Sequence, residues 1–177
     1  MTDERQALIT TFSGKMVDPF NPDPEQICLS DIAQSLSLQV RFCGHINDFL
    51  SVAQHCVMVS DMCETELGKK WGLLHDASEA YISDVPRPLK QHLSLFREVE
   101  ERLFRAIAER FKLDYPMPDE VAFYDYVSLH MESRDFMPNG ACVPKPEGYE
   151  VPSTRLAVWE PKDAKERFRQ KCWELLS

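Results

Sequence analysis

The chain has 177 residues, 44% of them hydrophobic and 28% charged, which suits one folded domain with a core and is short for two. The formal net charge of −9 excludes a general nucleic-acid binder, because such proteins need a basic surface. A small anionic substrate is compatible, since a metal ion and a few cations can create a local positive pocket. No segment approaches the roughly 18 apolar residues of a membrane span. Residues 1–11 lack the apolar stretch of a signal peptide, so we expect a cytoplasmic protein with neither a membrane nor a nucleic-acid partner.

The sequence predicts an all-α fold, in which five or six helices and almost no sheet form a compact helical bundle. Ser and Asp predict helix starts, and prolines predict helix ends and irregular segments. One domain over 1–177 is expected, with an irregular lead-in (1–29), a metal-site core (30–136) and a loop with a last helix (137–177). In the first half of the chain, we expect a short helix capped by Ser30, a helix from Asp48 to Gly68, and a helix over Leu73–Tyr81 that ends before Pro86. An amphipathic helix over 94–111, capped by Ser94, and a helix from an Asp119 cap to about Phe136 should follow. A Pro-rich loop over 137–158, which could hold a short hairpin (149–151 with 156–159), then leads to a helix that begins at Pro161.

A His–Asp pair within an apolar segment is the strongest functional signal in the chain. If residues 73–81 are helical, His75, Asp76 and Glu79 project from one side of that helix. Ionisable groups held together at low dielectric have to be paired, neutralised or bound to a metal. A divalent cation meets this requirement, because it makes adjacent ligands stabilising. We therefore predict a metal site at His75 and Asp76.

The remaining ligands should come from other helices. A lone His in the position of His55, on an apolar helix face, is more often a hydrogen-bonded core residue than a ligand. The His–Asp pair favours a ligand role here, because two imidazoles and a carboxylate from adjacent helices make a metal site. Asp119 is better explained as a helix cap, and Asp135 lies near a helix end. Asp125 lies inside its helix between two tyrosines, where a carboxylate needs a reason, and it is the predicted fourth ligand.

Four features occur in a characteristic order: SVAQH at 51–55, HDASE at 75–79, DVPRPLK at 84–90, and then Asp125. Together they resemble the HD-domain metal-dependent phosphohydrolases, in particular the 5′-deoxynucleotidase branch and its short relatives encoded by phages and prophages. The pattern of a His, a His–Asp pair and an Asp is loose by itself, and the segment from 75 to 90 makes it specific.

Two further segments, TFSG at 11–14 and RF-x-GH at 41–45, are shared with the phage-type relatives, so the likeness covers most of residues 11–136. The resemblance implies an HD-type helical fold and one divalent ion per site, which could be Mn, Co, Zn, Ni, Fe or Mg. It implies homo-oligomers, dimers or larger. The implied metal ligands are His55, His75, Asp76 and Asp125.

The resemblance also implies that Glu79 and Asp84 are catalytic carboxylates beside the metal. A divalent ion acidifies water and neutralises charge on phosphoryl oxygens, and a buried carboxylic acid can protonate the leaving oxygen. Glu79 is the first candidate for this acid, and Asp84 for orienting water or the sugar. Their alternatives are a solvated helix residue for Glu79 and a turn cap for Asp84.

The expected substrate-binding residues are Arg41, Phe42, His45 and Lys90. Arg41 and Lys90 could supply cations to phosphate or be surface charges, and His45 could line the pocket or lie in a loop. Phe42 stands where the 5′-deoxynucleotidase branch has Trp, and Gln54 where it has Glu. Because that Trp helps to read deoxyribose, the base and sugar preferences stay open.

The expected function is hydrolysis of a nucleotide phosphate ester or anhydride, most simply that of a (deoxy)nucleoside 5′-monophosphate. A compact dNTP triphosphohydrolase, such as a dATPase that releases triphosphate, could use the same metal site with a different leaving group. The further alternative is a nucleotide-binding module without turnover. The filled ligand and carboxylate positions favour the enzyme.

Overall fold

Eight α-helices dominate the computed structural model, which describes residues 8–140 and 142–177 and confirms the all-α prediction. Residues 1–7 and 141 lie outside the description, and with them most of the N-terminal stretch that we expect not to be a signal peptide. The described elements are β1 (Ile9–Thr10), β2 (Met16–Val17), η1 (Pro24–Gln26), α1 (Leu29–Leu38), η2 (Arg41–Gly44), α2 (Val52–Met62), α3 (Glu66–Leu74), α4 (Glu79–Ile82), α5 (Arg87–Lys90), α6 (Ser94–Phe111), α7 (Asp119–Phe136) and α8 (Pro161–Leu176).

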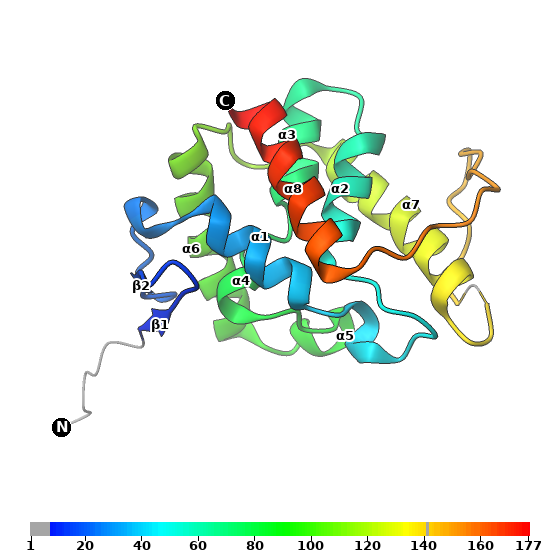
Figure 1. Cartoon of the computed structure of the whole chain (residues 1–177), viewed down its shortest axis with the longest axis horizontal. Helices are drawn as coiled ribbons and strands as arrows, with labels where there is room; N and C mark the ends of the chain where they lie inside the picture. Colours follow the sequence, from blue (N-terminus) through cyan, green and yellow to red (C-terminus); the bar gives the residue numbers. More distant parts are fainter. Residues whose placement is uncertain (1–7, 141) are drawn as a thin grey trace.

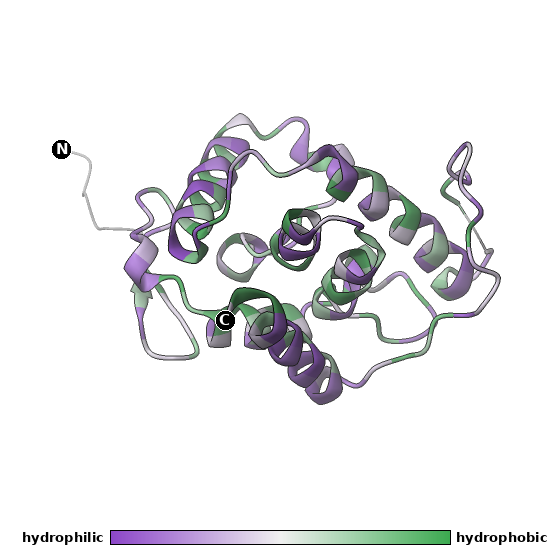
Figure 2. Cartoon of the chain, turned by 90° about the horizontal axis from the view of Figure 1, so that it is seen from above, coloured by the Kyte–Doolittle hydropathy of each residue, from purple (hydrophilic) through white to green (hydrophobic). Residues whose placement is uncertain are grey.

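Helices α2 and α3 lie at the centre of the bundle, where α7 packs against one side of them and α8 crosses both (Figure 1). The side chains of Trp71 on α3 and Phe168 on α8 are completely buried in this core. Seen from above, α8 turns its apolar face toward the other helices and its polar face outward (Figure 2). This amphipathic packing explains why a helix so distant in sequence closes the core over α1 and α2.

Three of the expected helices have the bounds that the sequence predicts: α6 over 94–111, α7 over 119–136, and α8 from Pro161. The caps differ by one residue, because Leu93 and Pro118 precede the first helical turns of α6 and α7, so Ser94 and Asp119 lie inside them. Ser30 likewise lies within α1, whose N-terminal flanking residue is Cys28. No described helix has the length and apolar character required to cross a bilayer.

The helix expected from Asp48 to Gly68 is wrong, because the chain forms two helices there. Ser51 caps α2 by accepting a hydrogen bond from the Gln54 amide, and Thr65 caps α3 in the same way. Gly68 lies in the first turns of α3, where a Cβ atom would collide with the Glu120 carboxylate. Gly68 therefore permits a close approach of α7 to α3 and does not end a helix.

The segment predicted as one α-helix over Leu73–Tyr81 is helical, but a tighter turn of the 3₁₀ type divides it into two α-helices. Helix α3 ends at Leu74, and α4 begins at Glu79. Between them, the backbone amides of Ala77, Glu79, Ala80 and Tyr81 donate to the carbonyl groups three residues earlier. This turn is of the 3₁₀ type, so the His–Asp pair lies at a junction between two α-helices.

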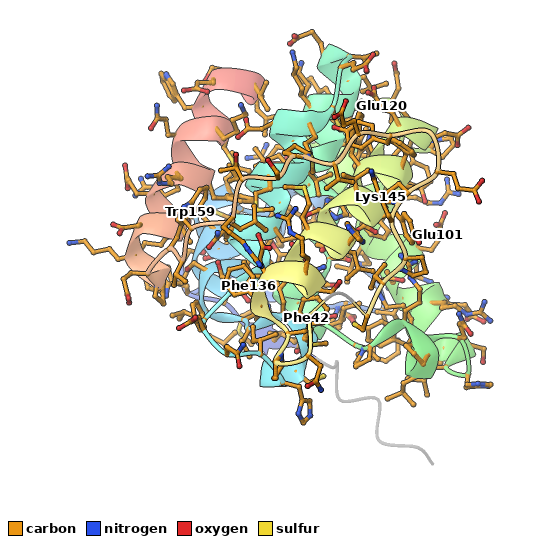
Figure 3. All side chains as sticks on the ribbon, turned by 90° about the vertical axis from the view of Figure 1, so that its right-hand side faces the viewer. Phe42, Glu101, Glu120, Phe136, Lys145 and Trp159 are labelled. Atoms are coloured by element: carbon orange, nitrogen blue, oxygen red, sulfur yellow. The ribbon has the colours of Figure 1, made fainter. Side chains whose placement is uncertain are left out.

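The lead-in contains a small antiparallel hairpin of β1 and β2, which the sequence prediction missed. The Ser13 amide and hydroxyl bind both oxygens of the buried Asp31 carboxylate, at 2.7 and 2.8 Å, and fix this segment to α1. In the loop over 137–158, the described residues form no strands, so the hairpin suggested there is wrong. Figure 3 shows this loop passing from Phe136 by Lys145 to Trp159 across the side of the molecule. Asp135 at the end of α7 holds it, because its carboxylate accepts from the Leu156 amide at 2.8 Å.

Candidate metal centre

Four predicted ligands come together where α2, α7 and the turn after α3 meet. Helix α2 supplies His55, the turn supplies His75 and Asp76, and α7 supplies Asp125. His55 is fully buried, and His75 is 7% exposed. The side chains of Asp76 and Asp125 are 18% and 20% exposed, so the acidic side of the group faces solvent. The structure thus brings together two buried imidazoles and two half-buried carboxylates.

The spacing of the donor atoms suits one small divalent ion. One donor atom each from His55, His75 and Asp76 lies within 4.8 Å of the others, so these residues form a group that could hold a metal ion. The His55 Nε2 atom is 3.1 Å from His75 Nε2, 3.5 Å from Asp76 Oδ2 and 3.3 Å from Asp125 Oδ1. Ligands bound at about 2.1 Å in a tetrahedron lie about 3.4 Å apart. The His75 Nε2 atom is 3.4 Å from Asp76 Oδ2 and 4.0 Å from Asp125 Oδ1, so Asp125 is the most loosely placed of the four.

The hydrogen bonds behind the imidazoles fix the direction of their lone pairs. The His55 Nδ1 atom lies 2.7 Å from a Glu132 carboxylate oxygen, and His75 Nδ1 lies 2.8 Å from the Gly72 carbonyl oxygen. Both oxygens can only accept, so each Nδ1 carries the proton and donates. Both neutral imidazoles then point an Nε2 lone pair at each other across 3.1 Å. Such an arrangement needs a cation between the rings, either a metal ion or an additional proton.

The pKa values agree with a cation at this place. Burial and the Arg41 guanidinium lower the pKa of His55, but Glu132 and Asp125 outweigh them and raise it to about 10. The pKa of Asp125 is held far below its usual range, where its hydrogen bond and attraction to His55 overcome the cost of burial. A metal ion bound between these side chains would have to displace a proton from His55.

Glu132 is a component of this site that the sequence analysis missed. It lies seven residues after Asp125 on the same face of α7, and it is completely buried. Its Oε2 atom accepts from Arg41 Nε at 3.0 Å. A carboxylate at that spacing from a predicted ligand, among the apolar residues of a helix, is the signal that could have revealed it.

A cavity of about 420 Å³ opens in front of the metal group, within the usual size range of small-molecule sites. Asp76, Glu79, Asp84 and Asp125 line it, as do apolar residues of α7 and of the loop after it. The cations on its wall are Arg41, Arg87 and Lys90.

Glu79 lies against this cavity in an environment that favours its protonated form. It is 4% exposed, and its Oε2 atom has no hydrogen-bond partner among the described residues. Burial, followed by repulsion from Asp76 and Asp84, raises the pKa of Glu79 to about 9. Glu79 is therefore not the solvated helix residue of the alternative interpretation. Its carboxyl group faces the cavity in surroundings that favour the protonated form.

Asp84 is held beside Glu79 by the side-chain amide of Gln39, which lies just after α1. The Gln39 Nε2 atom donates to the Glu79 carbonyl oxygen at 3.0 Å, and its Oε1 atom accepts from the Asp84 amide at 3.1 Å. Ser83, between the two carboxylates, has a φ of 68°, which is unfavourable for a residue with a side chain. Burial raises the pKa of Asp84, although Arg41 opposes this shift.

The sequence is 39% identical to the uncharacterized protein YfdR of Escherichia coli over 153 residues, which cover 85% of this chain and 83% of YfdR. The chain belongs to the YfdR family. An uncharacterized protein of Rhodobacter capsulatus is 32% identical over 123 residues, or 64% of this chain and 63% of that protein. No protein-family profile matches the chain. Neither name states an activity, so a function for the YfdR family has to come from the chemistry of its side chains.

The predicted substrate-binding residues are only partly brought together. Phe42 and Lys90 line the cavity, and Lys90 is bound to Glu100 at 2.7 Å. Phe42 and the following Cys43 both have left-handed backbone conformations, with φ of 55° and 51°. His45 is exposed and does not line the cavity, because this left-handed turn carries it to the surface. The expectation that His45 lines the pocket is therefore wrong.

Proposed function

We propose that the chain is an HD-domain phosphohydrolase that uses one divalent metal ion to hydrolyse a nucleotide phosphate, most simply that of a (deoxy)nucleoside 5′-monophosphate. The observation that carries the proposal is the pair of opposed imidazole nitrogens, 3.1 Å apart, beside a cavity that is also lined by the buried carboxyl group of Glu79. His55, His75, Asp76 and Asp125 would hold the ion. The order of these residues in the chain matches the order of the family's motif.

The donor set fits a divalent ion of the first transition row, since imidazole and carboxylate are both ligands for Zn, Fe, Ni and Mn. When bound, such an ion would acidify water and neutralise charge on the phosphoryl oxygens. The exposed side of the group at Asp76 and Asp125 faces the cavity, so a phosphate could reach it there. The buried side, with the two histidines, would only bind and orient.

Glu79 would donate the proton that the leaving oxygen needs. A phosphate ester breaks to give an alkoxide, which is a poor leaving group unless it is protonated. In the metal-free protein the pKa of Glu79 is raised to about 9 by burial and by Asp76 and Asp84, an environment that favours the protonated form which an acid needs. Asp84, five residues later and tied to Glu79 through Gln39, would orient the attacking water or the sugar.

The cations on the cavity wall favour a monophosphate over a triphosphate. Each of them is already engaged with a carboxylate: Arg41 with Glu132, Lys90 with Glu100, and Arg87 with Asp125. A bound divalent ion would itself be largely balanced by Asp76 and Asp125, so the site offers little surplus positive charge, which suits a phosphate monoester with a charge of roughly −2 better than a more highly charged group. A triphosphate carries more charge and would need cations without partners, which this wall does not offer among its described residues.

The test is a screen of nucleoside mono- and triphosphates with Mn²⁺ or Co²⁺, using wild-type protein and Asp76→Ala. The products identify the reaction, because phosphate, pyrophosphate and triphosphate separate on anion exchange. We expect wild type to release phosphate from a monophosphate and Asp76→Ala to release none. Release of triphosphate would support the alternative enzyme. Nucleotide binding without any product would overturn the enzyme and support a binding module.

A second variant isolates the acid. Glu79→Gln keeps the shape of the side chain and all four predicted ligands, so it should bind metal like wild type. Loss of proton donation typically costs a factor of about 10² to 10⁴ in rate. An unchanged kcat in Glu79→Gln would remove Glu79 from the reaction and leave the metal site in place.

A further inference from the structure

We propose that Glu132 and Arg41 are positioning residues of the metal site, and that together they set its affinity for the ion. This inference rests on the proposed function only in that it requires a metal ion at His55, His75 and Asp76. It gives Arg41 a role that differs from the expected one. Arg41 would position the metal ligands instead of binding the substrate.

Glu132 acts on the histidine ligand. Its Oε1 atom accepts from His55 Nδ1 at 2.7 Å and from the Ser128 hydroxyl at 3.0 Å. Its other carboxylate oxygen is ion-paired with Arg41, which is always charged, so the carboxylate accepts from Nδ1 and does not donate to it. The Nδ1 proton is therefore fixed, and the Nε2 lone pair is directed at the other ligands. A carboxylate behind a histidine ligand also makes that ligand more basic and orients its ring.

Arg41 acts on the carboxylate ligand. Its Nε atom donates to Glu132 Oε2 at 3.0 Å, and its Nη1 atom lies 3.6 Å from Asp76 Oδ2. The side chains of Arg41 and Glu132 are 11% and 0% exposed, so water can replace little of this pairing. A continuous chain of charged groups thus runs from Asp76 through Arg41 and Glu132 to His55. The two ligands at its ends, whose donor atoms lie 3.5 Å apart, are thereby held in place relative to each other.

The backbone at Arg41 supports a fixed position for its guanidinium. The Arg41 amide donates to the Leu50 carbonyl at 2.9 Å, and Val40 and Ser51 form an isolated β-bridge, so the residue is tied to the start of α2. The left-handed turn of Phe42 and Cys43 begins immediately afterwards. Moving Arg41 outward to a substrate phosphate would break the ion pair with Glu132 and leave a buried carboxylate without its cation, which is costly.

The experiment measures the dissociation constant for Co²⁺ alone, by absorption and by calorimetry, in wild type, Glu132→Gln and Ser128→Ala. A glutamine can either accept from Nδ1 or donate to it, so it no longer fixes the proton. We expect Glu132→Gln to bind Co²⁺ about 10- to 100-fold more weakly. Ser128→Ala removes a neutral contact to the same ring nitrogen, which lies 3.2 Å away, and should change affinity by less than about threefold.

Two further measurements show whether weak Co²⁺ binding by Glu132→Gln comes from misfolding or from the loss of a positioning contact. The double variant Arg41→Met with Glu132→Gln removes both buried charges, so it should fold even if Glu132→Gln does not, yet it should still bind Co²⁺ weakly. Nitrogen chemical shifts of His55 in the zinc-loaded protein report which ring nitrogen is protonated. We expect Nδ1 in wild type and a changed pattern in Glu132→Gln.

The outcomes separate the two proposals. If wild type binds no Co²⁺ at the histidines, the metal site itself is wrong, and the proposed function fails with it. If wild type binds Co²⁺ and both variants that lack Glu132 bind it equally well with an unchanged His55 pattern, only the positioning role is overturned.

Discussion

Replacing Glu79 by Gln should change how the stability of the metal-free protein depends on pH. The wild-type carboxyl has its pKa raised from 4.5 to about 9 by burial and by Asp76 and Asp84. Between these two values, the folded state binds a proton that the unfolded state has lost. Stability therefore falls as pH rises through this window, because folding has to retain a proton that becomes scarcer. The contribution is fully present below pH 4.5 and lost above about 9.

The size of the effect follows from the shift. One pKa unit corresponds to about 1.4 kcal/mol, so a shift from 4.5 to about 9 gives an upper limit of roughly 6 kcal/mol at high pH. Relaxation around the buried charge will reduce this figure to a few kcal/mol, which is still a large part of the 5–15 kcal/mol typical of a domain. Glu79→Gln has no such proton to lose. Its stability relative to wild type should therefore rise steadily from pH 5 to pH 9.

The assay is urea unfolding followed by circular dichroism, with a chelator present, at unit steps from pH 5 to pH 9. The exposed Glu66→Gln serves as a control and should run parallel to wild type, because that side chain is 78% exposed. Parallel pH profiles for wild type and Glu79→Gln would refute the reasoning. His55 also titrates abnormally, but its contribution is common to the wild type and both variants. A bound divalent ion should reduce the difference, since positive charge nearby favours the carboxylate.

Two substitutions test the packing that positions the site. Gly72→Ala would place a methyl group 2.9 Å from the backbone of Ser60, so overpacking of about 1–3 kcal/mol should exceed the gain of about 1 kcal/mol in helix propensity. Denaturant titration should show a net loss of stability, and an alanine variant more stable than wild type would contradict the tight α2–α3 crossing. Phe168→Ala removes a fully buried ring and should cost about 3–5 kcal/mol, measured by the same titration. If the loss stayed below about 1 kcal/mol, α8 would not be part of the core.

The long helices and the meeting of His75, Asp76 and Asp125 at one place could be predicted from the sequence because each has a strong local cause. The apolar period of 94–111 defines α6, and Pro161 defines the start of α8. His75 and Asp76 stand out because ionisable groups in an apolar segment need a partner. Asp125 stands out because a carboxylate between two tyrosines inside a helix also needs a partner. These arguments depend on neighbours in the chain and not on the final fold.

The errors arose where a distant contact decides the local structure. The sequence predicts a helix end at Gly68, but the role of Gly68 is set by Glu120, which is 52 residues later and occupies the space of a Cβ atom. Glu132 was missed because its importance depends on Arg41 reaching it from the turn before α2. The sequence predicts that His45 lines the pocket, but Phe42 and Cys43 adopt left-handed conformations and His45 lies at the surface. Nothing in the sequence reveals these conformations.

The buried Gln54, next to His55, has an implication for the order of events during synthesis. Its side-chain amide donates to the Ala157 carbonyl at 2.6 Å and accepts from the Trp159 amide at 3.1 Å, so its polar atoms are satisfied by a segment about a hundred residues later. Until that segment leaves the ribosome, the Gln54 amide has neither partner, and burying it unpaired would cost about 1–3 kcal/mol, so it stays in water. The core also lacks Phe168 until then. A nascent chain that already displays His55, His75, Asp76 and Asp125 would therefore still hold a cation poorly, and metal loading would follow the docking of the C-terminal helix.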